Sequence, residues 1–391
     1  MLSFMNTRPV WALINLDHLI HNIKEIKKNL SPSACLSGVI KADGYGHGAI
    51  MIARTILANG VDRLAVATLS EALELRKHHI KAPILILGYT PGFQANDIIE
   101  HDIIQTVLSY EQAEALSYAA EGLDRQAKIH IKIDTGMSRL GFDANNQAIG
   151  DILKISQLPN IEIEGIFSHF ALADAENPKF TDVQNEKFKN FVSKLESQGL
   201  EIPIKHISNS AAILNNPEYH YDMVRAGLLM YGLYPSEFVS HKKMDLKPVM
   251  SLKATISQTR SLEKGKGISY GHSFVTKRDS IIGTIPIGYA DGYSRLLSNK
   301  IYVGVKGQAA RVVGNICMDQ CMIDLTDIER MDVGDEVFLF GDGNHGEPSV
   351  DEIANVLGTI NYEILCILSK RVPRAYIKNN EVIRIRDYLL E

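Results

Sequence analysis

Lys41 and the glycines that follow it are the first candidates for chemistry in this sequence. The segment VIKADGYGHG puts Lys41 at the end of a short apolar run and glycines at positions 44, 46 and 48. A desolvated lysine amine has a lowered pKa and can attack an aldehyde, while glycines let the backbone approach a ligand closely. A lysine at the end of a strand more often only extends its amine into water. The residues around Lys41 must therefore show whether its amine is desolvated and reactive. The glycine spacing is GxGxG, one residue short of the GxGxxG of dinucleotide-binding loops, and that alternative ranks low.

Polar residues also end several other apolar runs up to about residue 230. In KIHIKID, three polar residues alternate with isoleucines, as in a strand with two different faces: His130, Lys132 and Asp134. Arg139 follows this run. Later runs end in Ser168 and His169, in Ser208, Asn209 and Ser210, and in Arg225 before Gly227. These residues form one site only if the ends of the runs meet in space.

The runs indicate eight strands separated by helices, between Asn15 and about Met230. They are LSGVIKA, DRLAVAT, PILILGY, IIQTVLS, KIHIKID, IEGIFSH, IKHISNS and YDMVRAG. Helix signals lie between them, including Asp17 before an apolar repeat and two capping boxes, Thr68 with Glu71 and Ser109 with Gln112. Eight alternating units fit a closed (β/α)₈ barrel of the TIM type better than an open doubly wound sheet. The strand count alone separates these two folds.

In such a barrel, chemistry lies at the carboxyl ends of the strands, where Lys41 and the polar residues above would converge. The loops after the seventh and eighth strands are the usual phosphate site, which would contain Asn209, Ser210 and the backbone at Gly227. Taken singly, each of these loops could equally be an ordinary turn with no role in binding phosphate. They gain weight because Lys41 would face the same ligand.

The pattern changes after about Pro248 to short β-runs divided by glycine-rich turns, such as SIIGTIPIGYA and EVFLFGDG. This predicts a second, mainly antiparallel β-domain. A helical insert should begin at Ser349, where SVDE is a capping box, and a hairpin should turn at Asn379 and Asn380. We expect a barrel domain over residues 1–245 and a β-rich domain over 246–391, with about the first 14 residues packed on the second.

Bulk composition excludes several classes of protein. The 391 residues are 45% hydrophobic and 22% charged, with a net charge of −5 and no apolar stretch long enough to span a bilayer. Without a basic surface, nucleic acid is an unexpected partner, and we expect no membrane partner. The start lacks a secretion signal, which favours the cytoplasm. Four scattered cysteines predict neither a disulfide framework nor a metal site.

At this point the chain resembles the alanine racemase family. VIKADGYGHG resembles the cofactor-lysine motif, and further segments follow in family order over nearly the whole chain: HIKIDTGMSRLGF, GIFSHFA, HISNSAA, MVRAGLLMYGLYP, ISYG, IPIGYADG, GNICMDQCM and TINYE. The resemblance implies an N-terminal barrel, a C-terminal β-domain and pyridoxal 5′-phosphate as cofactor. It also implies a head-to-tail homodimer in which each site borrows residues from the partner's second domain, with L-alanine and D-alanine as substrates.

Residue by residue, the resemblance implies that Lys41 holds the cofactor covalently and serves as one base, with Tyr270 of ISYG as the other. Racemisation needs two groups on opposite faces of the substrate carbon, because one base that returns its proton to the same face causes no inversion. Without the resemblance, Tyr270 would be a half-buried strand aromatic, since a free tyrosine near pKa 10 is a poor base at neutral pH.

Arg225 resembles the arginine that contacts the pyridine nitrogen of the cofactor. A guanidinium keeps its proton, so it hydrogen-bonds to that nitrogen without protonating it, and the ring withdraws electrons less strongly. From spacing alone, an ion pair with Asp222 is about as probable. Lys132 and Arg139 resemble a pair in which the lysine is carbamylated to N6-carboxylysine and orients the arginine toward the substrate carboxylate. The structural alternative is Lys132 paired with Asp134.

The remaining site residues come from the same resemblance. His169 would lie beside the cofactor ring, and the phosphate would be held by Tyr45, Ser210, Gly227, Leu228 and Tyr362, together with Asn209 of the loop after the seventh strand. The backbone amide of Met318 would contact the substrate carboxylate, with Asp319 supporting its loop. Asp174 and Tyr289 match residues of a narrow entrance. The sequence departs from the pattern at Asn315, where many relatives have a basic residue.

Interconversion of L-alanine and D-alanine for peptidoglycan synthesis is therefore the expected function. A broader amino-acid racemase remains an alternative, because spacing does not reveal pocket width. A decarboxylase on the same fold would need a carboxylate in place of Arg225 and a cysteine-containing catalytic loop, and neither arrangement is found. A non-enzymatic cofactor carrier would use a lone barrel, without the segment that holds Tyr270.

Overall fold

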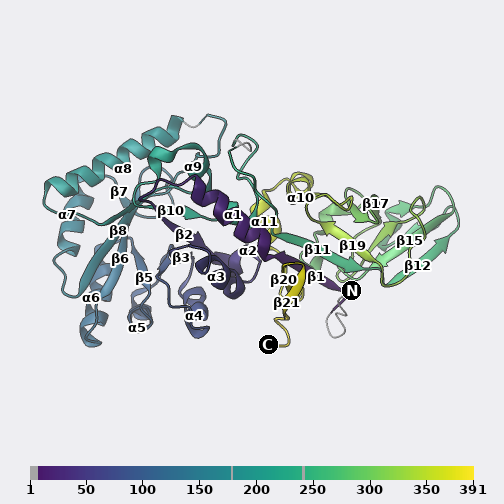
Figure 1. The fold of residues 1–391 in the computed structure, drawn as a ribbon, viewed down its shortest axis with the longest axis horizontal. Helices are drawn as coiled ribbons and strands as arrows, with labels where there is room; N and C mark the ends of the chain where they lie inside the picture. Colours follow the sequence, from purple (N-terminus) through teal and green to yellow (C-terminus); the bar gives the residue numbers. More distant parts are fainter. Residues whose placement is uncertain (1–7, 178, 240–242) are drawn as a thin grey trace. The chain divides into compact units, whose positions relative to one another are not determined.

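The structure is a computed structural model that describes residues 8–177, 179–239 and 243–391 (Figure 1). The chain packs into two compact units. Of the described residues, the unit that we call the barrel unit contains those within 20–44 and 49–246. The second, which we call the β unit, contains residues 8–19, the short segment 45–48 and residues 247–391.

Eight parallel strands form a nearly closed barrel, which confirms the predicted fold class. They are β2 (Cys35–Val39), β3 (Arg63–Val66), β4 (Ile84–Ile86), β5 (Ile104–Val107), β6 (Ala127–Asp134), β8 (Ile161–Phe167), β9 (Ile204–His206) and β10 (Met223–Ala226). Neighbours pair in the order β10-β2-β3-β4-β5-β6-β8-β9, and the two-residue β7 (Phe142–Asp143) pairs with β6. Two backbone hydrogen bonds bring β9 and β10 together, Asp222 N to Lys205 O and Arg225 N to Ser208 O, both 3.1 Å.

Helices alternate with the strands of the barrel unit, as the sequence pattern predicts. They are α1 (Leu16–Lys28), α3 (Ala49–Leu57), α4 (Leu69–Lys77), α5 (Ala95–Glu100), α6 (Tyr110–Gly122), α7 (Asn146–Ile155), α8 (Lys179–Ser197) and α9 (Ser210–Asn215), with α1 crossing the division between the units. The capping box of Thr68 and Glu71 is complete. Of the capping box predicted at Ser109, one hydrogen bond forms, in which the Ser109 side chain accepts from Gln112 N. The other was predicted wrongly, because the side chain of Gln112 accepts from Leu108 N instead of Ser109 N.

The β unit is built on a ten-stranded sheet in the order β12-β15-β18-β17-β16-β19-β11-β1-β20-β21. Its strands are β1 (Val10–Asn15), β11 (Met250–Thr255), β12 (Gln258–Leu262), β15 (Ser280–Ile285), β16 (Tyr302–Val305), β17 (Gln308–Val313), β18 (Cys321–Asp324), β19 (Glu336–Phe340), β20 (Arg374–Lys378) and β21 (Glu381–Arg386). The pairings are antiparallel except that of β1 with β20. The predicted antiparallel β-domain is therefore confirmed.

Local signals in the β unit also agree with the structure. Helix α10 (Val350–Leu357) begins after Ser349 with a complete capping box, and α11 (Asn361–Cys366) follows. Asn379 and Asn380 have φ values of 51° and 63° at the turn between β20 and β21, a left-handed conformation that asparagine tolerates. Among the described helices, none combines the length and the apolar character needed to cross a membrane.

Candidate active site

Lys41 follows β2 directly and opens α2 (Lys41–Tyr45), a turn of unusual backbone geometry. Ala42, Asp43 and Gly44 have φ values of 52°, 53° and 62°, and Tyr45 has a φ of 52°. The left-handed conformation is unfavourable by about 1–2 kcal/mol for each residue that carries a Cβ. A turn that places three such residues beside the candidate nucleophile is therefore held by the surrounding structure.

Side chains hold this left-handed turn at both ends. The Oε1 of Glu71 accepts a 2.6 Å hydrogen bond from Ala42 N, while its Oε2 completes the cap of α4 by accepting from Thr68 N at 3.1 Å. The Oδ1 of Asp43 accepts from Ala49 N at 2.8 Å. Glu71 therefore connects the turn after Lys41 to the start of the next barrel helix, a role that the capping motif alone did not reveal.

Arg225 lies on β10 in the barrel interior and is only 3% exposed. Its NH1 donates to His206 Nδ1 at 2.7 Å, and its NH2 donates to His169 Nδ1, Ser168 O and Ile207 O at 3.0–3.1 Å. The alternative ion pair with Asp222 is not formed, because that carboxylate accepts from Lys205 N. Burial and the charge of Arg139 lower the pKa of Arg225 to about 9, so the guanidinium remains charged at neutral pH.

His169 is held against Arg225 in a defined protonation state. A guanidinium has donors only, so Nδ1 of His169 must be the acceptor and Nε2 carries the hydrogen of the neutral ring. The pKa of His169 lies well below its ordinary value, because of burial and then the positive charges of Arg225, Arg139, Lys132 and Lys41. The barrel therefore brings these four predicted cations close to one imidazole.

Lys132 is 6% exposed and its Nζ donates to Ile133 O at 2.9 Å. Burial and the charge of Arg225 lower its pKa from 10.5 to about 7. The alternative pairing with Asp134 is not formed, because Asp134 Oδ1 accepts instead from three backbone amides of the following turn, residues 136–138. Arg139 comes next and is exposed, and no hydrogen bond or ion pair joins it to another residue that the structure describes.

The residues predicted for the phosphate fall into two groups. In the barrel unit, Ser210 Oγ accepts from Gly227 N at 3.1 Å, and Asn209 Oδ1 caps α9 through Ala212 N. Leu228 begins the short helix η3 (Leu228–Tyr231), and its amide meets no acceptor within the described residues. In the β unit, the rings of Tyr45 and Tyr362 lie with centroids 6.2 Å apart.

Tyr270 begins the single turn η4 (Tyr270–His272), between the paired strands β13 (Gly267–Ile268) and β14 (Phe274–Val275), and is 72% exposed. The preceding Ser269 has a φ of 63°, and its hydroxyl donates to Asn315 O at 2.6 Å. Asn315 Nδ2 in turn donates to Tyr270 O at 2.7 Å. Asn315, where the sequence departs from the family pattern, therefore fixes the backbone of the candidate base.

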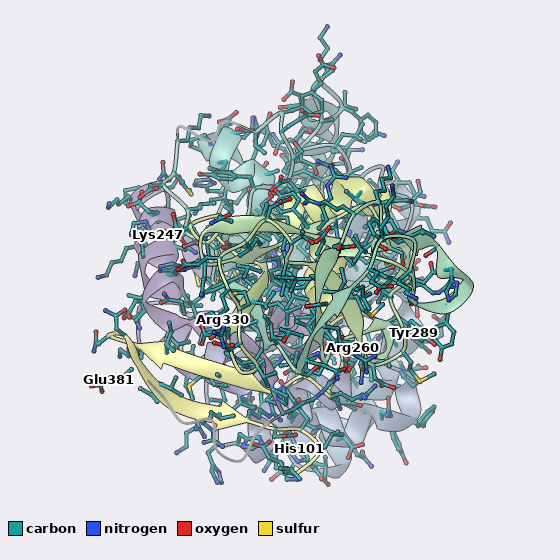
Figure 2. All side chains as sticks on the ribbon, turned by 90° about the vertical axis from the view of Figure 1, so that its right-hand side faces the viewer. His101, Lys247, Arg260, Tyr289, Arg330 and Glu381 are labelled. Carbon is teal, nitrogen blue, oxygen red and sulfur yellow. The ribbon has the colours of Figure 1, made fainter. Side chains whose placement is uncertain are left out.

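Met318 and Asp319 lie in a neighbouring loop of the β unit. Met318 is 52% exposed, and its carbonyl O accepts from Ala290 N at 3.0 Å, whereas its backbone N–H meets no acceptor among the described residues. Asp319 pairs with Arg371 at 2.7 Å. Tyr289, labelled in Figure 2, donates its backbone N–H to Cys317 O and keeps a half-exposed ring.

Sequence reasoning missed two sets of residues near these positions. Arg8 and Arg371 both pair with the fully buried Asp291, whose Oδ2 accepts from Gly288 N at 3.0 Å beneath the loop of Tyr289. No local motif indicates these partners. In the barrel, the buried His206 and the partly buried Glu164 are partners of residues on other strands, and the polar positions inside IKHISNS and IEGIFSH were the available signal.

Comparisons with known proteins agree over the whole chain. Residues 14–235 match the family model described as alanine racemase, N-terminal domain, and residues 249–376 match alanine racemase, C-terminal domain. The alanine racemase of Clostridium tetani is 51% identical, covering 99% of this chain and 100% of that protein. The structure of Clostridium difficile alanine racemase is similar with a TM-score of 0.95 at 45% identity, covering 98% of this chain and 99% of that chain. A Bacillus anthracis alanine racemase with bound L-Ala-P has a TM-score of 0.92 at 36% identity, with 98% of both chains covered.

Proposed function

Because this chain belongs to the alanine racemase family, we propose that it interconverts L-alanine and D-alanine in the cytoplasm and so supplies D-alanine for peptidoglycan synthesis. The family depends on pyridoxal phosphate, and we assign that cofactor to Lys41 of this chain. The observation that carries the proposal is the buried Arg225, which donates to imidazole and carbonyl groups and pairs with no carboxylate of the described residues.

The barrel residues fit an aromatic aldehyde with a ring nitrogen and a phosphate. Arg225 uses NH1 and NH2 toward the protein, and its Nε–H meets no acceptor within the described residues, which leaves a donor for a ring nitrogen. The unused amide of Leu228 and the hydroxyl of Ser210 suit phosphate oxygens. Gly227 and Asn209 complete the part of the proposed phosphate site that lies in the barrel unit, and Tyr45 and Tyr362 are assigned to the phosphate by the family resemblance alone.

Bound through Lys41, the cofactor supplies an electron-withdrawing ring that makes the Cα–H of an amino acid acidic. Arg225 donates a hydrogen bond to the ring nitrogen and keeps its own proton, which limits electron withdrawal. His169, neutral and fixed by Arg225, packs beside the ring without adding charge. This combination favours return of the proton to Cα over decarboxylation, which supports a racemase.

Two bases move the proton in the proposed mechanism. Lys41 Nζ takes or returns a proton on one face of Cα, and Tyr270 Oη does so on the other face, which produces inversion. We assign Tyr270 to the partner subunit of a head-to-tail homodimer. The 72% exposure of Tyr270 and the 52% exposure of Met318 support this assignment, because exposed residues are accessible to a partner subunit.

The substrate carboxylate would be held by Arg139 and by the backbone amide of Met318, whose loop is supported by Asp319. Only an unprotonated amine reacts with CO₂, and a pKa of about 7 keeps a large fraction of Lys132 neutral at physiological pH. We therefore assign N6-carboxylysine to Lys132, whose new carboxylate would accept from Arg139. Asp174 and Tyr289 would narrow the entrance and so favour a small substrate.

The test is a racemisation assay with purified protein loaded with cofactor. Single enantiomers of alanine, serine, lysine and arginine are incubated separately and analysed by chiral chromatography. We expect each alanine enantiomer to reach the racemate, with slower conversion of the larger amino acids. Activity confined to lysine or arginine would overturn the alanine assignment, and release of CO₂ instead of racemisation would favour a decarboxylase.

A further inference from the structure

A chain of hydrogen bonds crosses the barrel interior from Arg225 to a partly buried ion pair. Arg225 NH1 lies 2.7 Å from His206 Nδ1, and His206 Nε2 lies 2.9 Å from His130 Nδ1. His130 Nε2 lies 2.9 Å from Glu164 Oε2. Arg63 binds both oxygens of Glu164, at 2.6 and 2.9 Å. Four barrel strands besides β10 therefore contribute to one connected set of polar groups.

The chemistry of the groups fixes the direction of every bond in this chain. Arg225 has no acceptor, so His206 Nδ1 must accept and His206 must carry its hydrogen on Nε2. That hydrogen points to His130 Nδ1, which must then accept, so His130 carries its hydrogen on Nε2 as well. This last hydrogen is donated to the carboxylate of Glu164. The donors thus run in one sense, from Arg225 through His206 and His130 to Glu164.

The backbone is shaped to build this arrangement. In the pairing of β6 with β8, Ile129 lies opposite Ile163 but His130 lies opposite Gly165, so Glu164 is the extra residue of a β-bulge. Bulges re-aim side chains in this way. A Cβ on Gly165 would lie 2.5 Å from the ring of His130, so glycine there makes room for the imidazole.

Packing against Phe167 holds the imidazole ring of His206. The rings of Phe167 and His206 are stacked, with centroids 4.6 Å apart and an interplanar angle of 5°. The guanidinium of Arg225 lies over the same Phe167 ring, 5.2 Å from its centroid. The aromatic ring therefore fixes His206 and Arg225 in one orientation relative to each other.

The pKa values along this chain of hydrogen bonds are consistent with neutral imidazoles at His206 and His130, between the cation of Arg225 and the anion of Glu164. Burial, and next the charge of Arg225, hold the pKa of His206 well below its ordinary value. Burial also lowers the pKa of His130, against the opposing effect of Glu164. Burial raises the pKa of Glu164, but hydrogen bonds from His130 and Arg63 outweigh it and bring the value to about 2. Glu164 is therefore an anion at neutral pH.

We propose that Glu164 is a positioning residue for Arg225, acting through His130 and His206 as its remote carboxylate. This rests on the proposed function, in which Arg225 contacts the cofactor. A carboxylate in direct contact would compete for the donors of Arg225, whereas the relay supplies a negative charge and leaves Nε–H for the ring nitrogen. The simpler alternative is that Glu164 serves only to pair with Arg63 and join β3 to β8.

The hydrogen positions can be tested without activity, by ¹⁵N spectra of histidine-labelled full-length protein. In the wild type we expect His130 and His206 to be neutral, with the hydrogen on Nε2, and not to titrate between about pH 6 and 9. Assignment uses His130→Asn and His206→Asn, each of which should remove one pair of signals. A cationic ring or a hydrogen on Nδ1 of His206 would overturn the relay.

The functional role is tested with Glu164→Gln, matched by Arg63→Met, which removes the same ion pair but leaves the relay intact. We expect Glu164→Gln to lower kcat about tenfold or more, the order of effect of losing an outer hydrogen-bond partner, while the KM for alanine stays within about twofold. Arg63→Met should change kcat less than about threefold. Equal losses of kcat in both variants, or none in Glu164→Gln, would overturn the proposal.

The experiments distinguish failure of the proposed racemase function from failure of the proposed role of Glu164. If the wild type does not racemise alanine, the proposed function fails, yet the imidazole spectra still test the hydrogen positions. Glu162→Gln, a change of the same kind two residues earlier on β8, controls for loss of one negative charge from the strand. It should behave as the wild type in both measurements, and a loss of kcat equal to that of Glu164→Gln would assign the effect to charge alone.

Discussion

In the barrel unit Arg225 and Lys132 are buried and Arg225 is bonded to His169, whereas in the β unit Tyr270 and Met318 stand in exposed loops. Arg225, at 3% exposure, donates to four acceptors, while Tyr270 is 72% exposed and its backbone carbonyl accepts from Asn315. Burial fixes orientation and shifts pKa values. The barrel therefore provides a preorganised electrostatic environment, and the β unit provides groups that need another surface to complete them.

The two regions share one feature, which is backbone held in the left-handed conformation next to a candidate base. Ala42 and Asp43 follow Lys41 with φ values of 52° and 53°, and Ser269 precedes Tyr270 with a φ of 63°. In both places side-chain hydrogen bonds hold the turn, from Glu71 in the barrel and from Ser269 itself in the β unit. Strain of this kind is found where a side chain must be presented in one direction.

Replacing the barrel base should have the largest effect. Lys41→Ala should lower racemisation by about 10⁴-fold or more, because it removes both a base and the covalent attachment of the cofactor. Mass spectrometry after borohydride reduction should find the cofactor on the wild type and not on this variant. Lys24→Ala, at an exposed position of α1, is the matched control and should keep both properties.

Replacing Tyr270, the candidate base of the β unit, should have the second largest effect on racemisation. Tyr270→Phe should lower racemisation about 10²- to 10⁴-fold, the range for a general acid–base residue, and leave thermal stability unchanged because the side chain is exposed. Tyr118→Phe, at an exposed position of α6, is the control. Normal racemisation of alanine by Tyr270→Phe would refute the two-base mechanism.

Mixing the two inactive variants tests whether the halves come from different chains. In a head-to-tail dimer of Lys41→Ala and Tyr270→Phe, one site carries both changes and the other carries neither. After random reassembly, about a quarter of the wild-type activity should return. Activity that stays at the level of the separate variants, with mixed dimers present in native mass spectra, would place both bases in one chain.

Lys132 makes the barrel half sensitive to pH. Its pKa falls on folding from 10.5 to about 7, so between these values the unfolded chain binds more protons and stability rises with pH. In CO₂-free buffer, the free energy of unfolding of the wild type, relative to Lys132→Met, should increase by at least about 1 kcal/mol from pH 7 to 10. Denaturant unfolding at both pH values measures it, and a difference that falls with pH would contradict the lowered pKa.

A smaller effect should follow from loosening the left-handed turn. Glu71→Gln keeps most of the capping geometry of α4 but weakens the bond to Ala42, and it should reduce stability by about 1 kcal/mol and kcat severalfold. Glu74→Gln, on the same helix, is the control. If Glu71→Gln loses stability but keeps full kcat, the turn serves the fold and not the presentation of Lys41.

The sequence by itself determined the architecture, because hydrophobic periodicity and turn residues are local properties. The eight apolar runs correspond to the eight barrel strands, and the predicted capping boxes at Thr68 and Ser349 are both present. The positions of Lys41, Arg225 and Tyr270 could be chosen from types and motifs. Their roles remain predictions that depend on family resemblance. Spacing alone left two alternatives open, an ion pair of Arg225 with Asp222 and a half-buried strand position for Tyr270.

Only the tertiary structure decided which of these residues touch. The bulge that turns Glu164 toward His130 depends on how β6 and β8 pair, and no signal within either strand sets that register. The segment 45–48 packs with the β unit, where Gly46 O accepts from Arg374 Nε at 2.9 Å over a separation of 328 residues. Contacts between residues so far apart are set by the packing of whole elements, which local sequence patterns do not encode.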